Sequence, residues 1–265
     1  MAIAYVQGVT REGFEDTTSA PTGTLSATPT AGNLLVIVAI MRDGPSGRTV
    51  TAPSGFSLLK DYDDASSTYA VFYKIAGASE ATSFTWTWTN DSYVQGSFLF
   101  ELSGVDGTTP IDVSASAFTD HGFTGSDVAE PAITTVTNGA WDIPLVGMDT
   151  DGPGAAMVSP SGYTERCDLA SFAVYTKEIA TAGSTGSRTM SHVNTNIVTY
   201  SFAVRPSGGA IAGQPLAKRF GGVPFMGAHG SGLQAPVRQW IRRASGLLTP
   251  QFATTQIWRP AHGID

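Results

Sequence analysis

Two stretches of the chain match each other: TAGNLLVIVAIM at residues 30–41 and TNGAWDIPLVGM at residues 137–148. In both, a Thr-x-Gly turn leads into a long run of mostly apolar residues. Further matches keep the same order: Asp43-Gly44-Pro45 with Asp151-Gly152-Pro153, Pro53-Ser54-Gly55-Phe56 with Pro160-Ser161-Gly162-Tyr163, Tyr69–Phe72 with Phe172–Tyr175, Lys74 with Lys177, Ser97-Phe98 with Ser201-Phe202, and Ser103-Gly104 with Ser207-Gly208. A kept order of turns and apolar segments is typical of a duplicated β-unit.

The apolar pattern predicts strands throughout the first 208 residues. Residues 83–89 read SFTWTWT, with Phe84, Trp86 and Trp88 on one face and Ser and Thr on the other, which is the period-two pattern of a half-buried strand. Residues 34–41 are apolar at every position, as in a strand buried on both faces. The expected strands are 4–9, 34–41, 56–62, 69–76, 83–89 and 94–102 in the first copy, and 111–117, 141–148, 163–169, 172–179, 187–192 and 197–204 in the second.

Short strands separated by Gly, Pro, Asp and Asn predict an all-β body, a β-sandwich or jelly roll built from two pseudo-repeats. No stretch before residue 209 has helical periodicity. The copies, at about 1–104 and 105–208, could form two tandem sandwiches or interlock in one sandwich. The interlocked form is favoured, because runs that are apolar on both faces are hard to hide in a thin sandwich and because the connection at 104–110 is short.

Residues 209–265 form an extended C-terminal arm rich in Gly, Pro and Ala. The arm holds six Lys and Arg residues and the single acid Asp265, so its formal charge is +5. Because the whole chain has a formal net charge of −7, the rest of the chain carries −12. This asymmetry predicts that the arm meets an acidic surface, on its own subunit or a neighbouring one. One short helix is expected over 235–248, where Pro236 suits the first turn and Gly246 can end it.

The aromatic and arginine residues of the arm are the candidate partner-interface residues, because such side chains dominate many protein interfaces. They are Phe220, Phe225, Arg238, Trp240, Arg242, Trp258 and Arg259. The arm lacks the dense basic cluster that many phosphate contacts require, which argues against nucleic acid as a partner. The apolar run 34–41 is too short to span a membrane, and the first residues lack the features of a cleavable signal, so we expect a soluble protein made in a cytoplasm.

The sequence contains no recognisable catalytic, metal or cofactor motif. The histidines His121, His192, His229 and His262 lack metal-ligand spacing. Cys167 is the single cysteine and falls in an expected strand, which predicts a buried, inert thiol. Residues 230–235 match a dinucleotide fingerprint only loosely, without the strand that should precede it. We expect no catalytic residue, no cofactor and no metal, and a protein that is not an enzyme.

Two groups of aspartates could in principle bind calcium. Asp61, Asp63 and Asp64 follow an expected strand, and Asp149 and Asp151 precede a glycine. Neither group has the spacing of a calcium loop, so a solvated turn that caps a strand end is the favoured interpretation of both.

Glycoside hydrolysis requires two carboxylates across a cleft, and the candidates by chemistry alone are Glu80, Glu101, Glu130, Glu165 and Glu178. Glu101 interrupts an apolar strand, and its match in the second copy is Arg205. Opposite charges at equivalent positions favour a surface or rim location, as an intramolecular pair with a structural role. Trp86 and Trp88 could stack on a sugar ring, but their alternation with Phe84 favours a place in the core.

The motifs of the first copy run in a fixed order. They are Gly32 before an apolar strand, the Pro-Ser-Gly-aromatic turn 53–56, Lys-Ile-Ala-Gly at 74–77, the Trp-Thr strand, and Ser-Gly-Val at 103–105. This pattern resembles repeats in tail, head-fibre and head-decoration proteins of bacteriophages and in related bacterial surface proteins. The resemblance covers about residues 1–208, and KRFGGVPF at 218–225 is also similar to short segments of phage structural proteins.

The resemblance implies a virion component, without implying a role for any single residue. The expected protein is a non-enzymatic minor capsid, decoration, head-fibre or tail component that binds other virion proteins and copies of itself through its arm. The alternative is a carbohydrate-binding module that attaches to a host-surface glycan, and a glycan-degrading enzyme is a third hypothesis. An exposed aromatic patch in a groove would favour sugar binding, and two facing carboxylates would favour the enzyme.

Overall fold

The computed structural model describes residues 1–14, 20–42, 46–64, 67–89, 94–125, 127–149, 157–169, 172–190 and 195–210, and two short strands at 240–242 and 248–250. Every helix or strand assigned in these residues is a β-strand, which confirms the all-β fold class. The described part holds no helix that could cross a membrane. The internal contacts of the chain divide it into two units, Met1–Leu216 and Ala217–Asp265.

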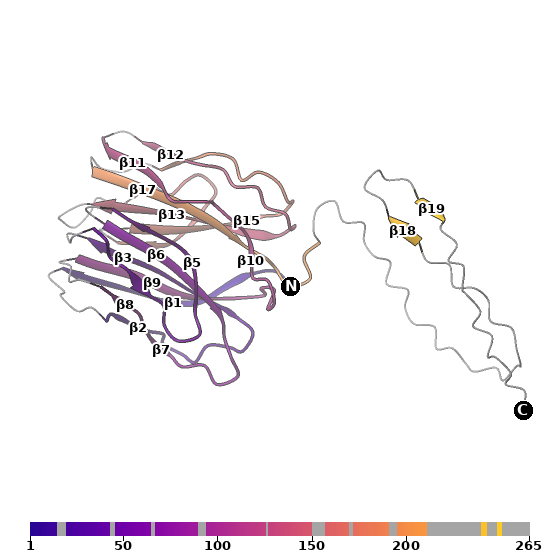
Figure 1. Ribbon diagram of the computed structural model, residues 1–265, viewed down its shortest axis with the longest axis horizontal. Coiled ribbons are helices and arrows are strands. Elements are labelled where there is room, and N and C mark those ends of the chain that lie inside the picture. The colour runs from indigo at the N-terminus through magenta and orange to yellow at the C-terminus, as the bar shows by residue number, and fades with distance from the viewer. Residues whose placement is uncertain are drawn as a thin grey trace, which may run out of the picture. The chain divides into compact units, whose positions relative to one another are not determined.

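Two antiparallel sheets with the same strand order form the body (Figure 1). The first sheet has the order β1 (Ala4–Phe14), β9 (Val94–Ser103), β3 (Leu34–Arg42), β6 (Ser67–Ile75) and β5 (Ser57–Asp63). The second has the order β10 (Ile111–Ser114), β17 (Thr195–Val204), β13 (Ala140–Asp149), β15 (Phe172–Ile179) and β14 (Thr164–Asp168), and β11 (Thr119–Thr124) also pairs with β17. The equal order is what a duplication predicts, since each strand of the second sheet takes the place of its counterpart in the first.

The matched turns also share their backbone geometry. The glycine of the turn 53–56 has a φ of 81° and that of the turn 160–163 a φ of 79°, in the left-handed region that glycine adopts without steric cost. In each turn the amide of the final aromatic residue donates to the proline carbonyl at 3.0 Å. The ammonium of Lys74 lies 5.8 Å from the centre of the first turn's aromatic ring, and that of Lys177 lies 5.0 Å from the second. Gly, aromatic residue and Lys are therefore kept together as one packing unit.

One apolar core fills the space between the two sheets. Alternate residues of β3, beginning with Leu34 and Val36, face strands β13 and β17 of the second sheet, which contribute Leu145 and Tyr200. Each copy thus supplies one sheet of the sandwich, and each sheet buries its inner face against the other. The copies interlock in a single β-sandwich.

The two copies are related by an approximate two-fold axis. At one edge of the sandwich the ring of Tyr62 in β5 lies 5.8 Å from that of Phe118, which precedes β11. At the other edge the guanidinium of Arg166 in β14 lies 4.8 Å from the ring of Tyr5 in β1. Because β1 corresponds to β10–β11 and β5 corresponds to β14, exchanging the copies converts one contact into the other.

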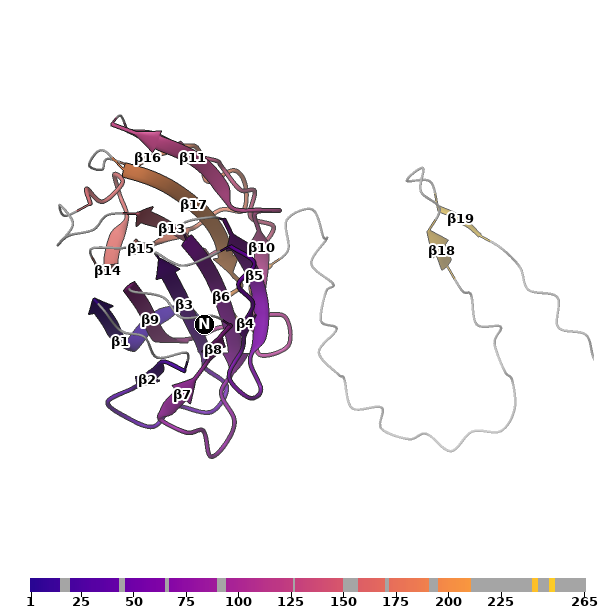
Figure 2. The same ribbon diagram turned by 60° about the vertical axis from the view of Figure 1, so that its left-hand side comes forward.

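A smaller layer of short strands covers the outer face of each sheet (Figures 1 and 2). Over the first sheet, β2 (Thr22–Thr24) pairs with β7 (Ser83–Thr85) and β4 (Val50–Thr51) with β8 (Thr87–Trp88); over the second, β12 (Val128–Glu130) pairs with β16 (Arg188–Met190). Phe84, Trp86 and Trp88 are buried in the outer layer of the first copy, against alternate residues of β3. This confirms their predicted core position and explains why β3 is buried on both faces.

The last strand of each copy is aligned differently from the sequence match. Val38 pairs with Phe98, and its counterpart Leu145 pairs with Tyr200, so Phe98 corresponds to Tyr200. The sequence match of Phe98 with Phe202 is therefore wrong by two residues. Because side chains alternate with a period of two, a slip of two leaves every residue on its own face. The apolar pattern could not detect the slip.

Within 209–265 the structure describes two strands, β18 (Trp240–Arg242) and β19 (Leu248–Pro250), which pair with each other in antiparallel register. Strand β18 lies inside the stretch 235–248 where the sequence predicts a helix, so that prediction is wrong at 240–242; apart from Leu248 in β19, the remainder of the stretch lies outside the described residues. A helix of this length is marginal in isolation. Trp240 and Ile241 are of residue types that favour strands, which is consistent with the strand pair found there.

Candidate functional site

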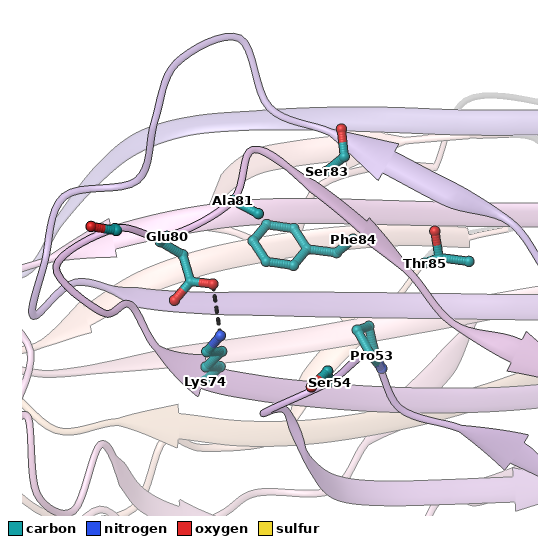
Figure 3. A pocket seen from close by; sticks show the side chains of 9 residues that line it. Pro53, Ser54, Lys74, Glu80, Ala81, Ser83, Phe84 and Thr85 are labelled. Carbon is teal, nitrogen blue, oxygen red and sulfur yellow. Dashed lines mark hydrogen bonds and ion pairs between the residues drawn. The ribbon is translucent and has the colours of Figure 1, made fainter.

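A pocket of about 460 Å³ opens in the outer layer of the first copy (Figure 3). Lys74 and Glu80 line it and form an ion pair, with Nζ donating to Oε1 at 2.6 Å. The ring of Phe84 lies beside this ion pair (Figure 3). The pocket is lined by Pro53, Ser54, Lys74, Ser79, Glu80, Ala81, Ser83, Phe84 and Thr85. Hydroxyls, an ion pair and an aromatic ring give it the chemistry to bind a polar, uncharged molecule.

Glu80 is ionised at neutral pH. Partial burial raises the pKa of its carboxyl, but the Gly77 amide, which donates at 2.9 Å, and the Lys74 ammonium outweigh this effect and lower the pKa overall. The charge of Glu80 therefore stabilises the turn that starts at Gly77.

Three charged side chains meet beneath the outer layer of the second copy. Arg188 in β16 donates from Nη1 to Oδ2 of Asp142 in β13 at 2.8 Å, and its Nη2 lies 3.5 Å from Oε1 of Glu130 in β12. The side chains of Arg188, Asp142 and Glu130 are 3%, 0% and 2% exposed. We call these three residues the ionic cluster. Its burial makes every unpaired charge costly.

Neighbouring polar groups satisfy part of the cluster. The hydroxyl of Tyr163 donates to Asp142 Oδ2 at 2.6 Å, and that of Ser201 donates to Glu130 Oε1 at 2.6 Å. Three atoms of the cluster have no hydrogen-bond partner within the described residues: Oε2 of Glu130, Oδ1 of Asp142 and Nε of Arg188. The cluster is only partly satisfied, in contrast to most buried polar groups.

Burial raises the pKa of both carboxyl groups in the ionic cluster. At Asp142, Arg188 and the Tyr163 hydroxyl oppose this effect at short range. At Glu130, hydrogen bonds from the Ser201 and Thr199 hydroxyls and the more distant charge of Arg188 oppose the effect of burial, whereas the charge of Asp142 raises the pKa further. Because Arg188 lies closer to Asp142, Glu130 is the carboxyl group of the two that gains less from the positive charge.

The first copy has an apolar set in place of the ionic cluster. Phe84 pairs with Gly23 across β7 and β2, as Arg188 pairs with Glu130 across β16 and β12. Leu35 occupies the β3 position that matches Asp142 in β13. In the first copy the ring of Phe84 lies 5.2 Å from the ring of Phe56. At the equivalent place in the second copy, the guanidinium of Arg188 lies 5.9 Å from the ring of Tyr163. Equivalent positions are therefore apolar in the first copy and ionic in the second.

Glu101 is wholly buried and does not lie at the rim, so the predicted location is wrong. Its carboxylate accepts hydrogen bonds from Gln7 Nε2 at 2.6 Å, the Thr30 amide at 2.8 Å and Asn33 Nδ2 at 2.6 Å. The predicted pair with Arg205 is also wrong, because Nε of Arg205 donates to Asp112 Oδ1 at 3.2 Å instead. The corrected alignment sets Glu101 opposite Leu35, where the second copy has Ala203 opposite Asp142. The three hydrogen bonds to its carboxylate join Glu101 to residues that are distant in sequence.

Two aspartates at the end of β5 accept hydrogen bonds from the backbone. Asp63 accepts a hydrogen bond from the Gly47 amide at 2.7 Å, and Asp64 accepts one from the Ser67 amide at 2.6 Å. The hydroxyl of Tyr62 bridges Asp64 and Asp120, with 3.0 Å to each. Within the described residues, no group of three His, Cys, Asp or Glu side chains is placed to hold a metal ion.

The remaining candidates are scattered. Cys167 is buried in β14, as predicted, and Glu165 and Glu178 are exposed on separate strands. The ring of His121 contacts the Thr199 hydroxyl at 3.0 Å. Asp151, His192, His229, His262 and the segment 230–235 lie outside the described residues.

The structure describes two of the seven predicted partner-interface residues. Phe220, Phe225, Arg238, Trp258 and Arg259 lie outside the described residues. Trp240 and Arg242 lie in β18, opposite Pro250 and Leu248 of β19.

Comparisons of the chain with protein-family models, curated proteins and solved structures return no match.

Sequence reasoning missed the ionic cluster, although the sequence holds a signal for it. Ser83-Phe84-Thr85-Trp86 corresponds to Ser187-Arg188-Thr189-Met190. The expected strand 187–192 lacks the Trp pair, and the mismatch puts an arginine at a core position. A buried arginine requires a carboxylate partner, which would have directed attention to Asp142.

Proposed function

We propose that this protein is a non-enzymatic structural component of a virion, whose β-sandwich body is displayed by a C-terminal arm that binds neighbouring virion proteins. The observation that carries the proposal is the division of the chain into a duplicated, internally packed body and a separate C-terminal unit of opposite charge. The motif pattern of the body, which resembles phage tail and head-decoration repeats, supports the same function.

The charge of the arm supports attachment to a protein surface. The arm contributes +5, whereas the remainder of the chain contributes −12. Such a segment is attracted to the acidic surface of a second copy or of an adjacent virion protein. The aromatic and arginine residues named above would then supply most of the binding energy.

Removal of the arm is the direct test. The cut should follow Leu216, because Ala210 still accepts a hydrogen bond from the Asn138 amide of the body at 3.2 Å. We expect the truncated chain to melt at the temperature of the full chain but to be absent from particles assembled with it. A truncated chain that unfolds would show that the arm belongs to the folded body, and one that still assembles would show that the arm is dispensable.

Point variants separate anchoring from a general charge effect. Changing Trp240 or Trp258 to Ala should reduce incorporation into particles, and changing Arg238 or Arg259 to Gln should do so more strongly at low salt. Gln239→Ala and Gln251→Ala are matched controls in the same segment and should assemble normally.

The pocket beside Lys74 favours a second candidate, a carbohydrate-binding module for a host-surface glycan. Its hydroxyl-rich lining suits a sugar, although Trp86 and Trp88 are buried and offer no stacking platform. A glycan array probed with the full chain tests this function. Binding that is lost in Ser54→Ala or Thr85→Ala but kept in Leu58→Ala, an exposed control outside the pocket, would favour the module.

A further inference from the structure

We propose that the β12–β16 layer is a pH-sensitive lid on the second sheet, which a proton on Glu130 holds closed and which loosens when that proton is lost. The inference concerns the ionic cluster alone and is independent of the proposed virion role.

The lid is small and is held over an apolar surface. Strands β12 and β16 have three residues each and cover Val146, Met148, Tyr175 and Ile197 of the second sheet. The corresponding layer of the first copy is fastened by Phe84, Trp86 and Trp88 in an apolar core. The lid has Arg188 at the Phe84 position, so its attachment depends on how well the ionic cluster is paired.

The charges around Glu130 come from every element packed against it. Arg188 in β16 and Asp142 in β13 face it directly, and the hydroxyls of Ser201 and Thr199 in β17 bond to it. Lys177 in β15 acts on Asp142, and the ring of His121 in β11 contacts the Thr199 hydroxyl at 3.0 Å. The Tyr163 hydroxyl, in the turn before β14, is already committed to Asp142.

One arginine cannot neutralise two buried carboxylates. Arg188 gives its 2.8 Å contact to Asp142 and only a 3.5 Å contact to Glu130. When Glu130 is protonated, the cluster is one ion pair plus a neutral acid, and the free Oε2 can carry the proton. When Glu130 is ionised, a second negative charge is buried beside Asp142, and opening the lid lets water solvate it.

The sign of the pH effect follows from proton linkage. Burial raises the pKa of Glu130 in the closed lid above the ordinary glutamate value of about 4.3 that it regains when the lid opens. Opening therefore releases a proton between those two pKa values. The opening equilibrium constant should rise by up to about tenfold per pH unit in that window and become constant above the pKa of the closed state.

Hydrogen exchange on the full chain tests the proposal, because the first copy is an internal control. Amide protection would be measured from about pH 5 to about pH 9 in peptides covering 128–130 and 188–190, and in peptides covering 22–24 and 83–85, after correction for intrinsic exchange. Glu80, the carboxylate near the control layer, has a lowered pKa and stays ionised throughout. We expect protection of the lid to fall with pH relative to the control layer.

Two substitutions assign the effect to Glu130. Glu130→Gln should abolish the pH dependence and keep the lid protected at high pH. Asp142→Asn makes Glu130 the only counter-charge of Arg188, so the pH window should move to lower pH even if the variant is less stable. A lid whose relative protection is independent of pH in the unmodified chain, or a Glu130→Gln variant that keeps the same slope, would overturn the proposal.

Discussion

The ring of Tyr69 occupies the space that a side chain at Gly147 would fill. A Cβ built on Gly147 would lie 2.0 Å from Cε1 of Tyr69, although Tyr69 belongs to the first sheet and Gly147 to the second. The glycine thus lets the two copies approach closely within their shared core.

Substitution of this glycine should destabilise the body. Gly147→Ala forces the tyrosine ring to move within a close-packed core, which typically costs about 1–3 kcal/mol. Urea denaturation measures the change in the free energy of unfolding. Gly107→Ala is the matched control, because a Cβ there meets nothing within 4 Å. Equal effects in the two variants would contradict the packing argument.

Trp86→Ala should reduce stability rather than any binding activity. The side chain is 1% exposed, and truncation of a large buried aromatic costs about 3–5 kcal/mol. Thermal melting measures the loss, with Leu58→Ala as the exposed control. A Trp86→Ala protein that melts normally but loses glycan binding would favour the carbohydrate-binding function.

Replacing the ionic cluster as a set should be milder than breaking it. Arg188→Met alone leaves Asp142 and Glu130 buried without their cation, which should cost about 3–5 kcal/mol. Adding Asp142→Leu and Glu130→Ala, which imitate the apolar set of the first copy, should recover most of that loss. Denaturant melts of the single and triple variants provide the comparison. No recovery in the triple variant would mean that the two layers are not equivalent.

The Lys74–Glu80 ion pair should stabilise the folded first copy at neutral pH, and this stabilisation should disappear in acid. Because the pKa of Glu80 is lowered in the folded state, its contribution is complete above the unfolded value of about 4.3 and disappears as the pH falls through the folded value. Glu80→Gln should therefore lose about 1–2 kcal/mol at neutral pH and less in acid. Chemical denaturation at several pH values would measure this; a loss that is the same at every pH would contradict it.

The sequence predicts the strands well because their signals are local. The strand Phe172–Ile179 has the expected bounds, and the burial of Trp86 follows from simple alternation. Short strands such as β2 and β12 give no such signal, because three residues carry too little periodicity. The two-residue slip in the last strand and the buried position of Glu101 both depend on partners far away in the sequence. Long-range pairing of this kind is set by the assembled fold.

The ionic cluster could not be predicted from local sequence either, because it also depends on residues that are distant in the chain. Asp142 and Arg188 lie in different strands, 46 residues apart, and each looks like an ordinary polar residue in its own segment. Only the comparison with Leu35 and Phe84 at equivalent places reveals that both are core positions. The partner-interface residues of the arm stay a prediction, since most of them lie outside the described residues.

The two-fold relation between the copies has a consequence for a half-length chain. A polypeptide holding only the first copy would present the bare inner face of its sheet to water, with Leu34, Val36 and their neighbours uncovered. It could bury that face by associating with a second molecule of itself in the same orientation. The body therefore has the form of a homodimer whose subunits have been fused head to tail, and the short link at 104–110 is the seam between them.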